Sequence, residues 1–168
     1  LFQNVIYEYP LSRAIKDGYT RTPFALTRKD IRSFNFDNEE LDKMMINDGI
    51  LHHENMKAEL LAYSINHQTK LVKPFMLIVC QHTKHAEEIM KYVNSDSFMF
   101  GSYIGKVIMI HSNQRGEEKD ENIRLLLDVE KPNNPVEIVI HVNILKEGWD
   151  VNNLYTIVPL RTATSKTL

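Results

Sequence analysis

The feature that most constrains the fold of this chain is a short apolar run near its middle. Residues 75–80, Phe-Met-Leu-Ile-Val-Cys, contain no polar side chain and come directly after Pro74. Six residues are too few for a typical helix, but they suit a strand that other elements cover on both faces. Strands of that kind belong to parallel sheets, whose neighbouring strands are connected by helices. The run therefore predicts an α/β fold built on a parallel sheet.

An alternation of helix and strand follows this run. Behind Thr83, which we expect to cap a helix, Ala86, Ile89, Met90 and Val93 recur at i, i+3, i+4 and i+7. The later apolar segments continue the alternation, with strands expected at residues 107–110, 136–142 and 154–158 and a charged helix around Ile123, Leu126 and Leu127. Because parallel strands need helical crossovers, this order of elements predicts a doubly wound sheet.

The first 70 residues are predicted to form a connection and a helical extension that lead into a sheet domain at residues 71–168. A strand-like segment at residues 5–9 precedes Pro10, which starts a short helix that ends at Asp17-Gly18. Two longer helices, separated at Gly49 and ending near Lys70, are expected next. Their capping box and apolar faces are formed by Asp37 and Glu40, by Leu41, Met44 and Met45, and by Met56, Leu60 and Tyr63. Whether residues 1–70 dock on the sheet stays open.

The composition narrows the classes of function. Lysine and arginine total 20 against 22 aspartate and glutamate, and the resulting net charge of −2 excludes a protein that holds nucleic acid by overall charge. Any contact with nucleic acid must be local. We expect Cys80 to pack as a small hydrophobe in a reducing, cytoplasmic protein. No apolar stretch reaches the roughly 18 to 20 residues that cross a membrane, and both chain ends are expected to be cuts in a longer polypeptide.

Ligands of an open parallel sheet bind beyond the carboxyl ends of the strands, where helix N-termini offer unpaired N–H groups. Three loops follow expected strands there, at residues 81–84, 111–116 and 143–150. In the third loop, Gly148 permits close approach of the backbone, and Asp150 offers a carboxylate that suits a ribose diol. Taken alone, the two residues are explained more simply as a turn and its cap. Four basic residues in or near these loops either form a track that contacts successive phosphates or are ordinary solvated surface charges. They are Lys84, Lys106, Arg115 and Lys146.

The stretch at residues 142–151, Val-Asn-Ile-Leu-Lys-Glu-Gly-Trp-Asp-Val, is followed by a strand and resembles motif V of superfamily 2 helicases. The resemblance is to the second RecA-like domain of the motor, in particular that of the restriction (Res) subunit of type III restriction enzymes. Residues 73–93 look like motif IV with its helix, residues 108–112 like the next strand and loop, and residues 9–18 like the connection into this domain. The resemblance implies a RecA-like (P-loop NTPase-type) three-layer α/β domain with a mainly parallel sheet and a helical N-terminal extension.

The resemblance also assigns candidate site residues. Gly148, Asp150 and the neighbouring Glu147 face the nucleotide, with Asp150 on the ribose. Residues that it places at the nucleic-acid backbone are Gln81, His82, Thr83, Lys84, His111, Ser112, Asn113, Asn143 and Lys146. Many members of the superfamily have a threonine near Val142-Asn143, so Asn143 takes over that phosphate contact in this interpretation. For His111, a satisfied histidine at a strand end is the alternative.

The implied activity belongs to a larger enzyme. The 168 residues contain no Gly-x-x-x-x-Gly-Lys-Ser/Thr phosphate loop, no Asp-Glu magnesium pair after a strand and no arginine-bearing motif VI. We therefore expect the parent to be an ATP-dependent helicase or translocase and endonuclease that uses Mg²⁺, with no catalytic residue and no tightly bound cofactor in this fragment. Its expected partners are double-stranded DNA, an N-terminal RecA-like domain and a nuclease domain of the same chain, and a modification methyltransferase subunit.

Two other classes of function stay open. A regulatory or binding α/β module, receiver-like or flavodoxin-like, needs an acidic pocket or a phosphate loop after the first strand, and neither is visible. A stand-alone enzyme with its site at residues 146–150 needs a base and a nucleophile nearby. The histidine pairs at residues 52–53 and at 82 and 85 lack the Cys or carboxylate that completes a metal site. The residues favour the motor domain.

Overall fold

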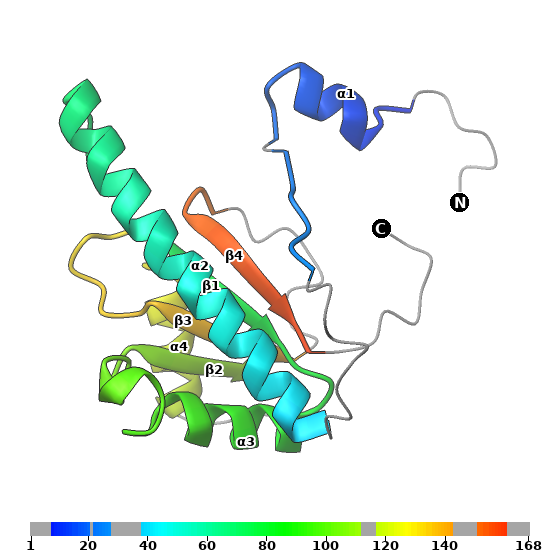
Figure 1. Ribbon diagram of the computed structural model, residues 1–168, viewed down its shortest axis with the longest axis vertical. Coiled ribbons are helices and arrows are strands. Elements are labelled where there is room, and N and C mark those ends of the chain that lie inside the picture. Colours follow the sequence, from blue (N-terminus) through cyan, green and yellow to red (C-terminus); the bar gives the residue numbers. More distant parts are fainter. Residues whose placement is uncertain (1–7, 21, 28–37, 112–116, 143–150, 161–168) are drawn as a thin grey trace. The chain divides into compact units, whose positions relative to one another are not determined.

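The structure is a computed structural model that describes residues 8–20, 22–27, 38–111, 117–142 and 151–160 (Figure 1). Its sheet has four parallel strands in the order β2-β3-β1-β4, and Ile78 of β1 pairs with Ile140 of β3 and with Val158 of β4. The expected parallel α/β fold is confirmed. The elements in chain order are α1 (Leu11–Lys16), α2 (Asn38–His67), β1 (Phe75–Val79), α3 (Thr83–Val93), the 3-10 turn η2 (Met99–Gly101), β2 (Val107–His111), α4 (Glu117–Leu127), β3 (Ile138–Val142) and β4 (Leu154–Pro159).

Helices cover both faces of the sheet. α2 and α3 pack on one face, and α4 packs on the other, where Figure 1 shows it behind β2 and β3. Alternate side chains of β1 enter the two cores, with Met76 and Ile78 on the side of α2 and α3 and Leu77 and Val79 on the side of α4. All five residues of β1 are buried for this reason, which explains the unbroken apolar run.

α2 is one continuous helix of 30 residues, so the prediction that Gly49 separates two helices is wrong. A side chain at Gly49 would overlap Val158 of β4 and touch Met76 of β1. The glycine therefore lets the helix approach the sheet closely. The buried residues of α2 are Ile46, Ile50 and His53 and, farther along, Ser64. Tyr63, which was expected on an apolar face of the helix, is exposed.

The chain divides by its contacts into residues 1–35 and residues 36–168. The first unit contains α1, which begins after Pro10 and ends at Asp17-Gly18 as predicted. The strand expected at residues 5–9 is absent at Glu8 and Tyr9, and its first three residues lie outside the described part. In the second unit, α2 packs against β1 and β4, so this part of the expected extension docks on the sheet.

One local prediction needs correction. The N-cap of α3 is His82 rather than Thr83, because the His82 side chain accepts a hydrogen bond from the backbone N–H of His85. The charged helix predicted around Leu126 and Leu127 is α4, in which Leu126 is buried and Leu127 is exposed. In the described part of the chain, no helix combines the length and apolar character that crossing a membrane requires.

Candidate functional site

The carboxyl ends of the four strands meet at one edge of the sheet because all strands are parallel. At this edge, residues 81–84 follow β1, and His111 is the last residue of β2. β1 and β3 are neighbours, but the chain leaves β1 toward β2 through α3 and leaves β3 toward β4. The two connections thus run in opposite directions along the sheet. Open parallel sheets bind ligands in the crevice at such a switch between neighbouring strands. A ligand site is therefore expected at the carboxyl ends of β1 and β3.

Polar side chains gather where the chain leaves β1. Gln81, His82 and Lys84 are exposed there, with Thr83 partly buried. The side-chain amide of Gln81 donates to the carbonyl oxygen of Leu160, just beyond β4, at 3.3 Å. Residues 81–84, four of those predicted to meet the nucleic-acid backbone, thus form one accessible polar segment at the N-terminus of α3, where the first N–H groups of a helix have no carbonyl partner within the helix.

The exit of β3 carries most of the other candidates. β3 ends at Val142 and β4 begins at Leu154, so residues 143–153 connect these two strands on either side of β1. The candidates in this connection or after β2 that lie outside the described residues are Ser112, Asn113, Asn143, Lys146, Glu147, Gly148 and Asp150. Their roles stay predictions.

His111 and Lys106 occupy different environments from the loop that follows β1. The His111 side chain is only 9% exposed, at the end of β2, and β3 lies between β2 and β1. Lys106 precedes β2 and is therefore at the opposite, amino edge of the sheet, where its ammonium lies 2.9 Å from Glu137 Oε1. The structure separates Lys106 from any phosphate track at the carboxyl edge.

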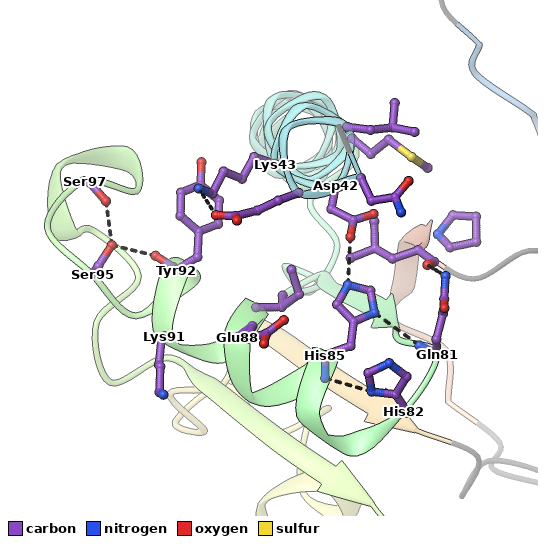
Figure 2. A pocket seen from close by; sticks show the side chains of 17 residues that line it. Asp42, Lys43, Gln81, His82, His85, Glu88, Lys91, Tyr92, Ser95 and Ser97 are labelled. Carbon is purple, nitrogen blue, oxygen red and sulfur yellow. Dashed lines mark hydrogen bonds and ion pairs between the residues drawn. The ribbon is translucent and has the colours of Figure 1, made fainter. Parts of the chain in front are cut away.

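A largely shielded hydrogen bond between Asp42 and His85 joins α2 to the edge of the sheet, a contact that sequence reasoning did not predict. The His85 Nδ1 atom accepts the backbone N–H of Gln81 at 3.4 Å, and Nε2 lies 2.8 Å from Oδ2 of Asp42 (Figure 2). Because Nδ1 accepts a hydrogen bond, the proton of the neutral imidazole is on Nε2 and is donated to Asp42. Both ring nitrogens are engaged, so His85 is a structural link and not a general base. Burial raises the pKa of the Asp42 carboxyl, although the hydrogen bond from His85 acts in the opposite direction.

An open groove of about 1030 Å³ lies between the first turns of α2 and the length of α3, beside the ends of β1 and β4. Its charged side chains include Glu39, Asp42 and Glu88 against Lys43 and Lys91, and Lys43 pairs with Glu39 at 2.6 Å. This balance does not favour the polyanionic backbone of DNA along the groove. Of the loop of residues 81–84, Gln81 and His82 line the groove, while Lys84 is exposed outside its lining.

Two further groups are structural. Cys80 is buried, and its burial, together with the nearby Asp42, raises the pKa of the thiol to about 12, so it stays a protonated core residue as predicted. At the amino edge, burial alone would raise the pKa of the Glu137 carboxyl. Hydrogen bonds outweigh that effect and hold the pKa well below its ordinary value. Lys57 and Lys106 supply them at 2.8 and 2.9 Å, since His53 Nε2, at 3.9 Å, is too far for a hydrogen bond.

Among the residues that the structure describes, no group of three or more His, Cys, Asp and Glu side chains is placed to hold a metal ion. Comparisons of the chain with protein-family models, with curated proteins and with solved structures find no match. The residues at the carboxyl edge of the sheet are therefore the basis for assigning a function.

Proposed function

We propose that this chain is the second RecA-like domain of a superfamily 2 helicase or translocase, similar to the motor of the restriction subunit of type III restriction enzymes. One observation carries the proposal. The connection that contains Lys146-Glu147-Gly148-Trp149-Asp150 leaves β3, and the neighbouring strand β1 leaves the sheet in the other direction into the polar loop of residues 81–84. The two segments that resemble helicase motifs V and IV thus start from adjacent strands at the ligand-binding edge.

Each segment offers chemistry that suits its proposed role. A carboxylate such as that of Asp150 accepts hydrogen bonds from both hydroxyls of a ribose, and Gly148 leaves room for the nucleotide beside the backbone. Lys84, His82 and the N-terminal N–H groups of α3 suit a phosphate of the DNA backbone. Such contacts position the DNA without selecting its sequence.

Turnover of ATP requires more groups than this chain contains. Phosphoryl transfer needs a phosphate cradle, metal-binding carboxylates and an arginine that stabilises the transition state. In the proposal these come from other parts of the parent enzyme, including an N-terminal RecA-like domain that supplies the other half of the ATP cleft. A change in the separation of the two domains, while both hold double-stranded DNA, moves the enzyme along the duplex.

The receiver-like alternative has less support. A receiver-like or flavodoxin-like module needs an acidic pocket or a phosphate loop after its first strand, whereas β1 is followed by Cys80, Gln81, His82 and Thr83.

The proposal is tested by Asp150→Ala in the two-domain motor, with DNA-stimulated ATP hydrolysis as the measurement. A hydrogen bond to a charged group contributes about 1.5–3 kcal/mol, so the KM for ATP is expected to rise about ten- to a hundredfold. Asp120→Ala, which removes an exposed carboxylate from α4, is the matched control and leaves the KM unchanged. A wild-type KM for Asp150→Ala contradicts the ribose contact, and a two-domain motor without DNA-stimulated hydrolysis contradicts the proposed function.

A further inference from the structure

The first turns of α2 are part of the candidate site, although sequence reasoning placed them in an extension ahead of the sheet domain. Asp42 lies on α2, 43 residues before His85, and the two side chains meet at 2.8 Å above the loop that follows β1 (Figure 2). The side chains of Asp42 and His85 are 19% and 11% exposed, so the hydrogen bond between them is largely shielded from water. A shielded hydrogen bond that involves a charged group is stronger than one at the surface.

From Asp42 a continuous series of hydrogen bonds reaches the loop backbone. Asp42 fixes the imidazole of His85 in one orientation and one tautomer, with the proton on Nε2. The unprotonated Nδ1 then accepts the N–H of Gln81, and the backbone N–H of His85 donates to Nδ1 of His82 at 3.1 Å. The imidazole orientation set by Asp42 therefore holds the N–H of Gln81 at the start of the loop, whereas the contact between His82 and the His85 backbone is the N-cap of α3.

The charge of Asp42 by itself acts against DNA binding. A carboxylate beside a loop that meets phosphates repels the polyanion, and Glu39, on the same helix and the same groove, has the same effect. The two acids differ in their contacts, since Glu39 pairs with Lys43 near the surface while Asp42 contacts His85. Comparing a variant that lacks Asp42 with one that lacks Glu39 therefore separates the effect of charge on DNA binding from the effect of holding His85 in position.

We propose that Asp42 is a positioning residue, which acts through His85 to hold the loop of residues 81–84 in the conformation that grips the DNA backbone. This inference rests on the proposed function, because that function makes the loop a DNA contact. It extends the site to α2, so any partner that shifts the first turns of this helix also changes the grip on DNA.

The test compares Asp42→Ala, Asp42→Asn and Glu39→Ala in the full chain, with a short fluorescently labelled DNA duplex of arbitrary sequence as the probe at low salt. Asp42→Ala removes the acceptor for His85, and its affinity is expected to fall about three- to tenfold, the effect of one to two hydrogen bonds. Asp42→Asn keeps an acceptor oxygen without the charge and stays at or above the wild-type affinity. Glu39→Ala binds as tightly as the wild type or more tightly. Equal effects of Asp42→Ala and Glu39→Ala overturn the inference, because charge alone then accounts for both.

Nuclear magnetic resonance of the same proteins measures the positioning step without DNA. The nitrogen chemical shifts of His85 are expected to report the Nε2–H tautomer in the wild type and in Asp42→Asn, and a change of tautomer populations in Asp42→Ala. The amide signal of Gln81 is expected to move in Asp42→Ala alone. An Nδ1–H tautomer in the wild type, or a Gln81 amide that does not respond to Asp42→Ala, refutes the inference whether or not DNA binds. Failure of the wild-type chain to bind the duplex, with the expected spectra, counts against the proposed function instead.

Discussion

Because α2 contacts the sheet closely at Gly49, we predict that Gly49→Ala destabilises the protein, the opposite of the usual effect of this substitution in a helix. In the interior of an exposed helix, Gly→Ala stabilises the folded state by about 1 kcal/mol, because alanine has the higher helix propensity. At Gly49 the added methyl group would overlap Cγ2 of Val158 and lie 3.4 Å from the Met76 sulfur. Val158 is only 4% exposed and pairs with Ile78, so it has little room to move.

The expected magnitude follows from two opposing effects. Overpacking of a filled core costs about 1–3 kcal/mol, which exceeds the gain in helix propensity. We therefore expect Gly49→Ala to lower the free energy of unfolding by about 1 kcal/mol and the Tm by about 2–4 °C. Val158→Ala alone costs about 2 kcal/mol, because it removes buried methyl groups. In that background, Gly49→Ala meets no Cγ2 atom and is expected to stabilise the protein by up to about 1 kcal/mol.

The assay is urea unfolding of the wild type, the two single variants and the double variant, followed by far-ultraviolet circular dichroism. Asn55→Ala, at an exposed position of the same helix, is the control for helix propensity and is expected to stabilise in both backgrounds. The diagnostic result is the change of sign of Gly49→Ala when Val158 is shortened. If Gly49→Ala stabilises both backgrounds equally, α2 does not approach β4 as closely as the structure indicates, and the reasoning is refuted.

Two further predictions concern stability. The pKa of Glu137 is lowered in the folded state, because hydrogen bonds from Lys57 and Lys106 outweigh the effect of burial, so its ionised form stabilises the fold above about pH 4.5 and this contribution is lost as the pH falls further. Glu137→Gln is expected to lower the Tm at neutral pH, with the difference from the wild type shrinking in acid; a constant difference between pH 7 and pH 3 contradicts this. Phe100 has φ +54° and is fully exposed, so Phe100→Gly is expected to stabilise by about 0.5–1 kcal/mol in urea unfolding. Ser102→Gly, at φ −62°, is the control and is expected to destabilise.

Local patterns predicted the elements whose burial follows a simple pattern along the chain. The run at residues 75–80 identified β1, and the spacing of Ala86, Ile89 and Val93 identified the buried face of α3. These predictions succeeded because each periodicity reflects one element and the faces that its neighbours cover. The loop after β1 was placed at the ligand edge by the same reasoning, since the direction of a parallel strand determines where its carboxyl end lies.

Contacts between segments that are distant in the sequence could not be predicted from local patterns. Gly49 has low helix propensity and was expected to end a helix, but packing against β1 and β4 favours a helix at this position. Lys106 was considered with the cations of the loops, yet it precedes its strand and pairs with Glu137 at the other edge. No spacing along the chain relates Asp42 to His85 or Lys57 to Glu137, so these pairs could not be predicted.

The sequence alone determines that the chain forms a parallel α/β sheet, because only strands covered on both faces need uninterrupted apolar runs between amphipathic helices. It also determines which residues are available for binding, including the candidate carboxylate Asp150. The tertiary structure decides the strand order β2-β3-β1-β4, which brings the exits of β1 and β3 together, and it decides that α2 contributes Asp42 to that edge. The physical reason is that periodicity records how much of each face is buried, whereas the identity of the covering residue depends on packing between elements far apart in the chain.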